Sequence, residues 1–255
     1  MKIIIAGYGF VGKAVANALE PVHEVIVQDP KYTDYKMVDH RDADGIIVCV
    51  GTPEDQYGNC DATDLFAVLD DVPVFMPILV KSTVTPAVID EIARRYPDHS
   101  VCYSPEFLRA ATGNKDFLDQ KFMVLGGEDP EGFWQELFRS VLTKCNLFFF
   151  CTPHESSIIK YTINSYLATK VAFFNEIFDL CQKADVDYDK IRQIVTHDSR
   201  IGSSHTLVPG PDGQRGFGGN CFPKDTKAFA RYANDLNTPL EILETVIESN
   251  GKIRN

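Results

Sequence analysis

A glycine-rich turn directly after the first apolar run constrains the fold of this sequence most. Residues 2–7, KIIIAG, are typical of a buried strand, and Gly7, Gly9 and Gly12 follow in G-x-G-x-x-G spacing at the start of a helical stretch. The first glycine allows a tight turn, the second lets the backbone approach a pyrophosphate, and the third lets helix and strand pack closely. The spacing predicts a dinucleotide-binding turn; the alternative is a turn that only packs a helix on a strand.

An acidic residue in register with this turn favours NAD as the dinucleotide. A second strand-like run, EVIVQD, ends in Asp29, which lies about 20 residues beyond the glycines. A carboxylate at that place accepts hydrogen bonds from the ribose hydroxyls and repels the 2′-phosphate of NADP. The residues expected to contact NAD here are Gly7, Tyr8, Gly9, Phe10, Val11, Gly12 and Asp29.

The apolar pattern changes from strand type to helix type at residue 153. Further strand-like runs lie at residues 45–53, 74–83, 101–107, 121–127 and 146–151. Continuous apolar runs separated by helices indicate a mainly parallel sheet covered on both faces. From Pro153 onward, apolar residues recur every three or four positions, which predicts one long helix and then shorter ones. We therefore expect an α/β protein: a Rossmann-like, doubly wound sheet in residues 1–152, followed by an all-helical domain in residues 153–255.

Composition excludes some classes of partner. The formal net charge is −11 and the isoelectric point is near 5.0, which argues against nucleic acid, because phosphate backbones bind clustered Lys and Arg. No apolar stretch approaches ~20 residues, so a cytoplasmic protein without a membrane segment is expected. The seven cysteines are scattered without C-x-x-C spacing, which suggests neither a disulfide framework nor a metal site.

Polar residues at strand ends and on the long helix are candidate site residues. Thr52, Thr83 and Glu106 follow predicted parallel strands, and ligands bind outside the carboxyl ends of such strands. Lys160 and Asn164 stand four apart on the long helix and so share one face. The alternatives are threonines that cap helices and a solvated lysine.

A single cysteine lies in the glycine-rich segment GFGGNCFPKD. Cys221 follows a turn that can approach a ligand closely, and Lys224 and Asp225 stand just beyond it. Such neighbours can favour a thiolate nucleophile. The residues by themselves leave a structural cysteine and a nucleophile both open.

Several of these segments together resemble a known family. The segments GYGFVG, GTP, KSTV, SPEFLR, IIKYTINSYLATKVAFFNEI, DSRIG and GFGGNCFPKD are similar, in order, to motifs of the UDP-glucose/GDP-mannose dehydrogenases. This resemblance implies an enzyme that oxidises a primary alcohol of a nucleotide sugar to the carboxylate, as in UDP-glucose to UDP-glucuronate. It implies two NAD+ per substrate and no metal. The unusual length of the long helix, together with Arg200, further predicts a homodimer formed through that helix.

The resemblance also assigns roles to individual residues. Cys221 matches the nucleophile that forms a thiohemiacetal and then a thioester, and Lys160 and Asn164 match the groups that stabilise oxyanion charge. Asp225 and Thr83 match residues that hold water, and Glu106 matches a proton-transfer group. Thr52, Thr83 and Lys224 are expected at the cofactor. The residues expected at the substrate are Glu106, Phe107, Leu108, Lys160, Asn164, Arg200 and Gly218, with Arg200 reaching into the neighbouring subunit.

The sequence departs from the family pattern in three places. Ala110 stands where a second glutamate is common, the segment 201–215 is longer than expected, and the sequence stops at Asn255, where the family continues into a second Rossmann-like, nucleotide-binding domain. Two other functions therefore stay open. One is a two-electron alcohol dehydrogenase with a structural Cys221, and the other is a non-catalytic NAD-binding or dimerisation module.

Overall fold

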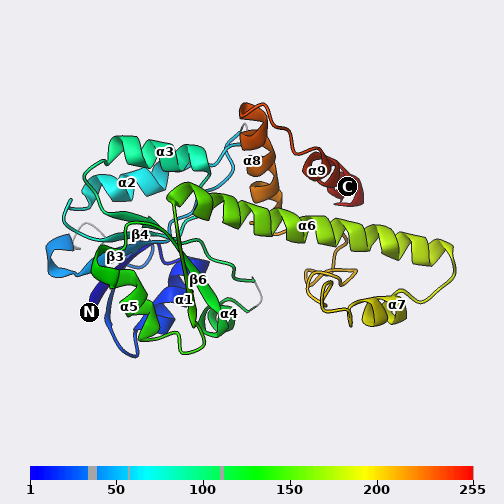
Figure 1. The fold of residues 1–255 in the computed structure, drawn as a ribbon, viewed down its shortest axis with the longest axis horizontal. Coiled ribbons are helices and arrows are strands. Elements are labelled where there is room, and N and C mark those ends of the chain that lie inside the picture. The colour runs from blue at the N-terminus through cyan, green and yellow to red at the C-terminus, as the bar shows by residue number, and fades with distance from the viewer. Residues whose placement is uncertain (34–38, 57, 110–111, 255) are drawn as a thin grey trace. The chain divides into compact units, whose positions relative to one another are not determined.

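The chain folds as two compact units. The computed structural model describes residues 1–33, 39–56, 58–109 and 112–254. The first unit comprises Met1–Asp55 with Cys60–Lys160, and the second comprises Gln56–Asn59 with Tyr161–Asn255 (Figure 1). The domain boundary expected at 152/153 coincides with the start of helix α6 (Pro153–Lys183), whose residues 153–160 belong to the first unit.

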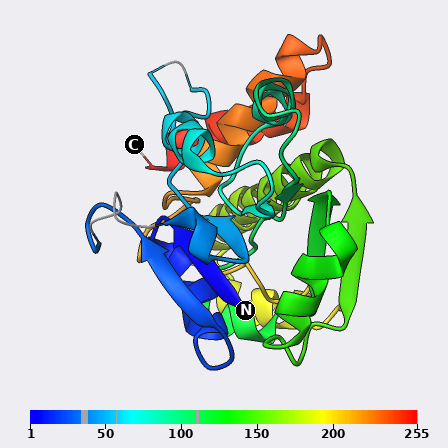
Figure 2. The same ribbon diagram turned by 90° about the vertical axis from the view of Figure 1, so that its left-hand side faces the viewer.

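Within the described residues, the first unit holds a seven-stranded sheet of order β2-β1-β3-β4-β5-β6-β7. The strands are β1 (Lys2–Ala6), β2 (Glu24–Gln28), β3 (Gly45–Val48), β4 (Ile78–Val80), β5 (Val101–Tyr103), β6 (Phe122–Gly127) and β7 (Leu147–Cys151). In Figure 2 the N-terminal strands (blue) lie at one side of the sheet and the last strands (green) at the other. All neighbouring pairs are parallel except β5 with β6, so the prediction of a Rossmann-like, mainly parallel sheet is confirmed.

Helices cover both faces of the sheet. One face packs on α1 (Phe10–Leu19), α4 (Gly113–Asp119) and α5 (Phe133–Arg139), with Trp134 fully buried among them. The other face packs on α2 (Thr63–Asp71) and α3 (Pro86–Arg95) (Figure 1). Because β1 has β2 on one side and β3 on the other, the strand order reverses there, and the crevice outside the carboxyl ends of β1 and β3 is where such sheets bind ligands.

The start of α6 is fixed by side-chain hydrogen bonds within the first unit. The backbone N–H and hydroxyl of Thr152 both donate to Glu155 Oε2, at 2.7 and 2.9 Å, which satisfies the helix start as a capping box does. The hydroxyls of Ser156 and Ser157, both fully buried, donate to the carbonyls of Tyr103 and Val84 at 3.1 and 2.7 Å. The first turn of α6 is thereby fixed to the end of β5 and to the segment that follows β4, one turn before Lys160.

The second unit consists of helices around the remainder of α6. They are α7 (Tyr188–Val195), α8 (Phe222–Asp235) and α9 (Glu241–Arg254). Ala168 and Ala172 of α6 pack on Phe217, with Phe222 and Val246 against the same cluster. The prediction of one long helix followed by shorter ones is confirmed, and α9 is a helix that the sequence pattern had not indicated.

Strand β7 closes one side of the sheet and carries exposed apolar side chains. Leu147, Phe149 and Phe150 are each more than half exposed, at 52%, 51% and 59%. The ring of Phe149 lies 6.0 Å from that of Phe122 on β6, centroid to centroid. In the described part of the chain β7 pairs with β6 alone, so its outer backbone groups are open to pairing.

Candidate active site

The glycine turn has the shape that a dinucleotide pyrophosphate needs. Gly7 has a φ of +88°, and a Cβ there would come within 2.7 Å of the Val50 backbone nitrogen. A Cβ at Gly12 would lie 2.0 Å from the Gly7 carbonyl oxygen, so only glycine lets α1 pack this closely. A Cβ at Gly9, by contrast, would meet no described atom within 4 Å. The open space lies at the N-terminus of α1, where backbone N–H groups favour phosphate.

Asp29 lies at this turn, as its position after β2 predicts. Its Oδ2 accepts a hydrogen bond from the Tyr8 backbone N–H at 2.7 Å, and its Oδ1 accepts one from the Lys31 N–H at 2.9 Å. Each carboxylate oxygen has further lone-pair capacity. The carboxylate is therefore fixed beside the turn and able to accept ribose hydroxyls.

Tyr32 and Lys13 also border the turn, and neither was predicted from the sequence. The Lys13 ammonium donates to the Tyr32 hydroxyl at 3.1 Å and lies 5.6 Å from the centre of the Tyr8 ring. The Tyr8 and Tyr32 rings meet edge to face, with centroids 5.3 Å apart. The available signal was weak: Lys13 directly follows the third glycine, and Tyr32 comes three residues after Asp29.

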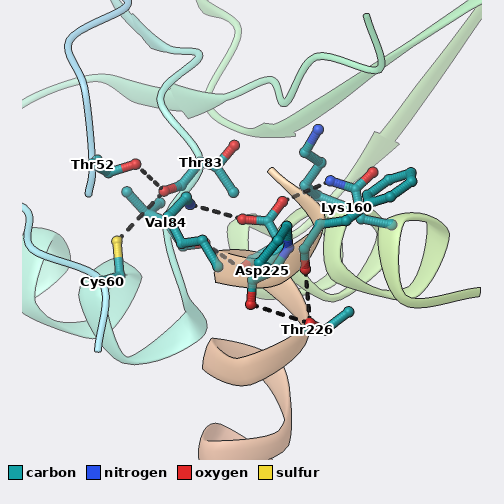
Figure 3. Close-up of polar contacts among 12 residues, drawn as sticks. Thr52, Cys60, Thr83, Val84, Lys160, Asp225 and Thr226 are labelled. Carbon is teal, nitrogen blue, oxygen red and sulfur yellow. Dashed lines mark hydrogen bonds and ion pairs between the residues drawn. The ribbon is translucent and has the colours of Figure 1, made fainter. Parts of the chain in front are cut away.

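Thr52 and Thr83, expected at the cofactor, contact each other. The buried Thr52 hydroxyl donates to the Thr83 carbonyl at 2.7 Å, and the Cys60 sulfur lies 3.5 Å from the same oxygen (Figure 3). These bonds fix the backbone that follows β4. Thr83 itself is half-buried, and whether its hydroxyl contacts a ligand stays a prediction.

Lys160 and Glu106 form a buried ion pair in the first unit. The Lys160 ammonium donates to the Glu106 carbonyl and to its Oε1, the latter at 3.1 Å, and the two residues are 2% and 8% exposed. The ammonium also lies 5.4 Å from the centre of the Phe107 ring. Glu106 Oε2 accepts the backbone N–H of Leu108, which packs on the core. The solvated alternative for Lys160 is therefore wrong, because the side chain is buried and paired with Glu106.

A second buried lysine, Lys81, was not among the candidates. It is 2% exposed and donates to the carbonyl and hydroxyl oxygens of Ser104, at 2.9 and 3.2 Å. Burial lowers the pKa of Lys81 from its ordinary value of 10.5 to about 8, against the opposing effects of Cys49 and Glu106. The KSTV segment is typical of the end of a strand, and its sequence does not indicate that the Lys81 side chain is buried.

The second unit brings Asn164, Asp225 and Lys224 together. Asn164 Nδ2 donates to Asp225 Oδ2 at 2.6 Å, and the Lys224 ammonium pairs with Asp225 Oδ1 at 2.7 Å. Asp225 is 1% exposed, so its charge is held by these two partners in a buried place. Lys224, expected at the cofactor, here serves as an ion-pair partner of Asp225.

Cys221 is the N-cap residue of α8 and is exposed. Its carbonyl accepts the backbone N–H of Asp225 at 2.8 Å, so the two residues stand one helical turn apart. A helix N-terminus favours negative charge, which suits a thiolate at this position. Cys49 and Cys102, in contrast, are buried, and burial raises the pKa of each thiol to about 12. Cys221 is thus not a buried cysteine, and its role as a nucleophile stays a prediction.

The remaining predicted residues have ordinary surroundings. The exposed Arg200 guanidinium donates to both carboxylate oxygens of Asp198, at 3.0 Å to Oδ1 and 2.6 Å to Oδ2. Phe107 packs on Phe122, with ring centroids 5.5 Å apart. Gly218 lies against Arg254, as described below, and Ala110 lies outside the described residues. The expected roles of Arg200, Phe107, Leu108 and Gly218 at a substrate stay predictions.

The described part of the chain offers neither a cluster of metal ligands nor a membrane-spanning helix. No group of three or more His, Cys, Asp or Glu side chains in it could hold a metal ion. No helix within these residues is both long enough and apolar enough to cross a bilayer.

The chain matches two domains of one enzyme family. Residues 30–144 match the NAD binding domain of the UDP-glucose/GDP-mannose dehydrogenase family, and residues 154–252 match the central domain of that family. The chain belongs to the UDP-glucose/GDP-mannose dehydrogenase family. The prediction of NAD as the cofactor is confirmed by the first of these matches.

Curated relatives are longer than this chain. A UDP-glucose 6-dehydrogenase of Rickettsia typhi is 33% identical over 230 residues, which cover 86% of this chain and 52% of the relative. UDP-glucose 6-dehydrogenase TuaD of Bacillus subtilis is 32% identical over 230 residues, covering 84% and 48%. The chain spans about half the length of the curated relatives it matches.

Solved structures share the fold. A UDP-glucose dehydrogenase from the hyperthermophilic archaeon Pyrobaculum islandicum superposes with a TM-score of 0.82 at 24% identity, over 98% of this chain and 68% of that one. A GDP-mannose dehydrogenase from Pseudomonas aeruginosa gives 0.70 at 24% identity, over 99% and 69%.

Proposed function

We propose that this chain carries out the NAD-dependent, four-electron oxidation of a nucleotide sugar to its carboxylate, with UDP-glucose as substrate and UDP-glucuronate as product. The observation that carries the proposal is the exposed Cys221 at the start of α8, one turn from the buried Asn164–Asp225–Lys224 network. Family membership and the curated relatives named UDP-glucose 6-dehydrogenase support this substrate class.

The first oxidation converts the primary alcohol to an aldehyde. The glycine turn before α1 and Asp29 would hold NAD+, which would supply a hydride acceptor for each of the two oxidation steps. Lys160 stabilises the negative charge on the alcohol oxygen as its proton leaves, because a fixed cation in a dry site acts strongly on developing charge. Glu106, paired with Lys160, takes part in that proton transfer.

The second oxidation requires a covalent bond to Cys221. The thiolate adds to the aldehyde carbon, and the resulting thiohemiacetal oxygen is stabilised by Lys160 and Asn164. Loss of the second hydride leaves a thioester. Water held by Asp225 and Thr83 attacks its carbonyl, the C–S bond breaks, and Cys221 leaves as the thiolate. Alcohol, water and two NAD+ thus give carboxylate, two NADH and three protons.

A panel of nucleotide sugars with NAD+ tests the proposal. Two NADH and one carboxylate per UDP-glucose consumed are expected, measured by absorbance and mass spectrometry. One NADH per substrate, with an aldehyde or ketone as product, would show a two-electron dehydrogenase. NAD+ binding without NADH formation from any sugar, at high protein concentration, would show a non-catalytic module.

Dimerisation through α6 is part of the same proposal. Tyr166, Phe173 and Leu180 are spaced seven residues apart on α6, and each is more than half exposed, at 63%, 56% and 62%. Residues at this spacing share one helix face, and an exposed apolar face of this kind marks a protein interface. Arg200 would reach the neighbouring subunit from such a dimer.

Phe173→Glu is expected to convert the dimer to a monomer, because the two-fold axis places two buried charges in the interface. Light scattering should give about 28.5 kDa for the variant and about twice that for the unchanged chain. Ile242→Glu, which alters an equally apolar residue that is 77% exposed on α9, is the matched control and should stay dimeric. A monomeric unchanged chain at micromolar concentration would refute the dimer.

We also propose a cytoplasmic location. The support is chemical: the proposed mechanism needs the Cys221 thiol reduced, and the described cysteines form no disulfide bond. A reducing compartment keeps an exposed thiol in that state.

A further inference from the structure

Two buried asparagines hold the backbone of the segment that leads to Cys221. Asn250 of α9 accepts the Phe217 backbone N–H through Oδ1 at 2.7 Å and donates through Nδ2 to the Phe217 carbonyl at 2.9 Å. Asn175 of α6 accepts the Gly216 N–H at 3.0 Å and donates to the Val171 carbonyl at 2.9 Å. They are 9% and 1% exposed, so water does not compete freely for these bonds.

The Asn250 amide pairs with both backbone groups of one residue, as a neighbouring strand would. Sliding or rotating the Phe217 backbone breaks two hydrogen bonds in a buried place and leaves their partners unsatisfied. The Phe217 side chain is 4% exposed and packs on Ala168 and Ala172 of α6. Backbone and side chain of this residue are therefore fixed from different helices, α9 and α6.

Helix α9 also lies close to the loop at two of its glycines, Gly216 and Gly218. A Cβ at Gly216, where φ is +70°, would come within 2.5 Å of Asn250 Oδ1. A Cβ at Gly218 would come within 2.3 Å of Arg254 Nη1. Arg254 in turn donates to the Gly216 carbonyl at 3.2 Å and pairs with Asp212 at 2.6 Å. The absence of a side chain at Gly216 and Gly218 thus allows the loop to pack against α9.

The segment 217–222, which contains Cys221, is held in place at both of its ends. Phe217 fixes the chain on one side of it, and Phe222, the first residue of α8, fixes it on the other; their rings lie 6.3 Å apart, centroid to centroid. Cys221 sits between them. The position of its sulfur consequently depends on where Asn250 holds Phe217.

We propose that Asn250 is a positioning residue for Cys221: it orders the glycine loop so that the thiolate reaches the aldehyde carbon in the second oxidation. This inference rests on the proposed function, in which only the second oxidation uses Cys221. Loss of Asn250 should therefore impair the two halves of the reaction unequally.

The nucleotide-sugar 6-aldehyde, used as the substrate, allows the two oxidation steps to be measured separately in the same protein. With NAD+ it is oxidised to the carboxylate, which needs Cys221, and with NADH it is reduced to the alcohol, which does not. Asn250→Leu should oxidise the aldehyde about 100-fold more slowly, since a small misplacement of a reacting group costs that much, while reduction changes by less than about threefold. Asn250→Asp keeps an acceptor for the Phe217 N–H but sets an oxygen in place of the donor to the Phe217 carbonyl, so oxidation should again fall more than reduction.

Asn234→Leu is the matched control. Asn234 is an exposed residue of α8 whose side chain donates to Glu244 of α9 at 2.7 Å, without touching the loop. Both rates should stay at the level of the unchanged chain. Equal loss of oxidation and reduction in Asn250→Leu, or no loss of either, would overturn the proposal. If Asn250→Leu does not fold, Asn250→Asp decides by the same comparison.

Hydrogen exchange tests whether Asn250 orders the loop, and it does not require enzyme activity. In Asn250→Leu the Phe217 amide loses its hydrogen bond to Asn250 and should exchange at least about tenfold faster, while peptides of α6 stay unchanged. Unchanged exchange in the loop would overturn the positioning role. If the unchanged chain neither oxidises nor reduces the aldehyde, the proposed function fails, and the exchange result still shows whether Asn250 orders the loop.

Discussion

Cys221→Ala is expected to abolish carboxylate formation while the first oxidation survives. The aldehyde carbon cannot give up a second hydride until a nucleophile has added to it, and the variant lacks that nucleophile. The rate of carboxylate formation should fall by about three orders of magnitude or more, the size seen when a nucleophile is removed. NADH yield should fall from two to one per UDP-glucose, with aldehyde as the product detected by mass spectrometry.

A second cysteine provides the control for this result. Cys151→Ala changes a half-buried thiol at the end of β7 and should keep both the yield and the rate. If Cys221→Ala still produces two NADH at the original rate, Cys221 has no covalent role, and the four-electron mechanism is wrong.

Lys81→Met is expected to remove a pH dependence of stability that the buried ammonium creates. The pKa of Lys81 is about 8 in the folded chain and 10.5 when exposed, because burial disfavours the charged form. Between these values the unfolded chain binds more protons, so the free energy of unfolding rises with pH. The difference between the two pKa values corresponds to about 3 kcal/mol. Below pH 8 the buried charge lowers the free energy of unfolding by this amount.

The measurement is urea unfolding of both proteins between pH 7 and pH 10.5. The stability of Lys81→Met relative to the unchanged chain should decrease by about 3 kcal/mol across this window, as the native lysine loses its proton. Lys121→Met, at an exposed lysine of the same unit, should follow the unchanged chain at every pH. A parallel pair of profiles for Lys81→Met and the unchanged chain would contradict a charged, buried Lys81.

Features with a fixed local geometry could be predicted from the sequence. The glycine spacing and the distance to Asp29 predicted the turn, because a strand, a tight turn and a helix leave a single place for the end of the next strand. Lys160 and Asn164 were placed on one helix by apolar periodicity alone. Apolar runs located the strands, although the fourth begins at Ile78, four residues later than the run at 74.

Features that depend on distant segments could not be predicted. The burial of Lys81 depends on Ser104, Phe117 and Phe138, which lie far along the chain. Asn250 is an ordinary polar residue in its own helix, and its role follows from Phe217, which lies 33 residues earlier. The antiparallel pairing of β5 with β6 likewise leaves no periodic mark, because each strand is apolar in either direction.

The exposed phenylalanines of β7 affect the tendency of copies of this chain to associate in solution. An unpaired strand edge with Phe149 and Phe150 outward can template pairing between copies, and mutual electrostatic repulsion opposes such encounters. With a net charge of −11 that repulsion is strong at neutral pH, and it vanishes near the isoelectric point of about 5.0. The solubility of this chain therefore depends on its acidic surface, and mild acidification removes the barrier that keeps sheet edges apart.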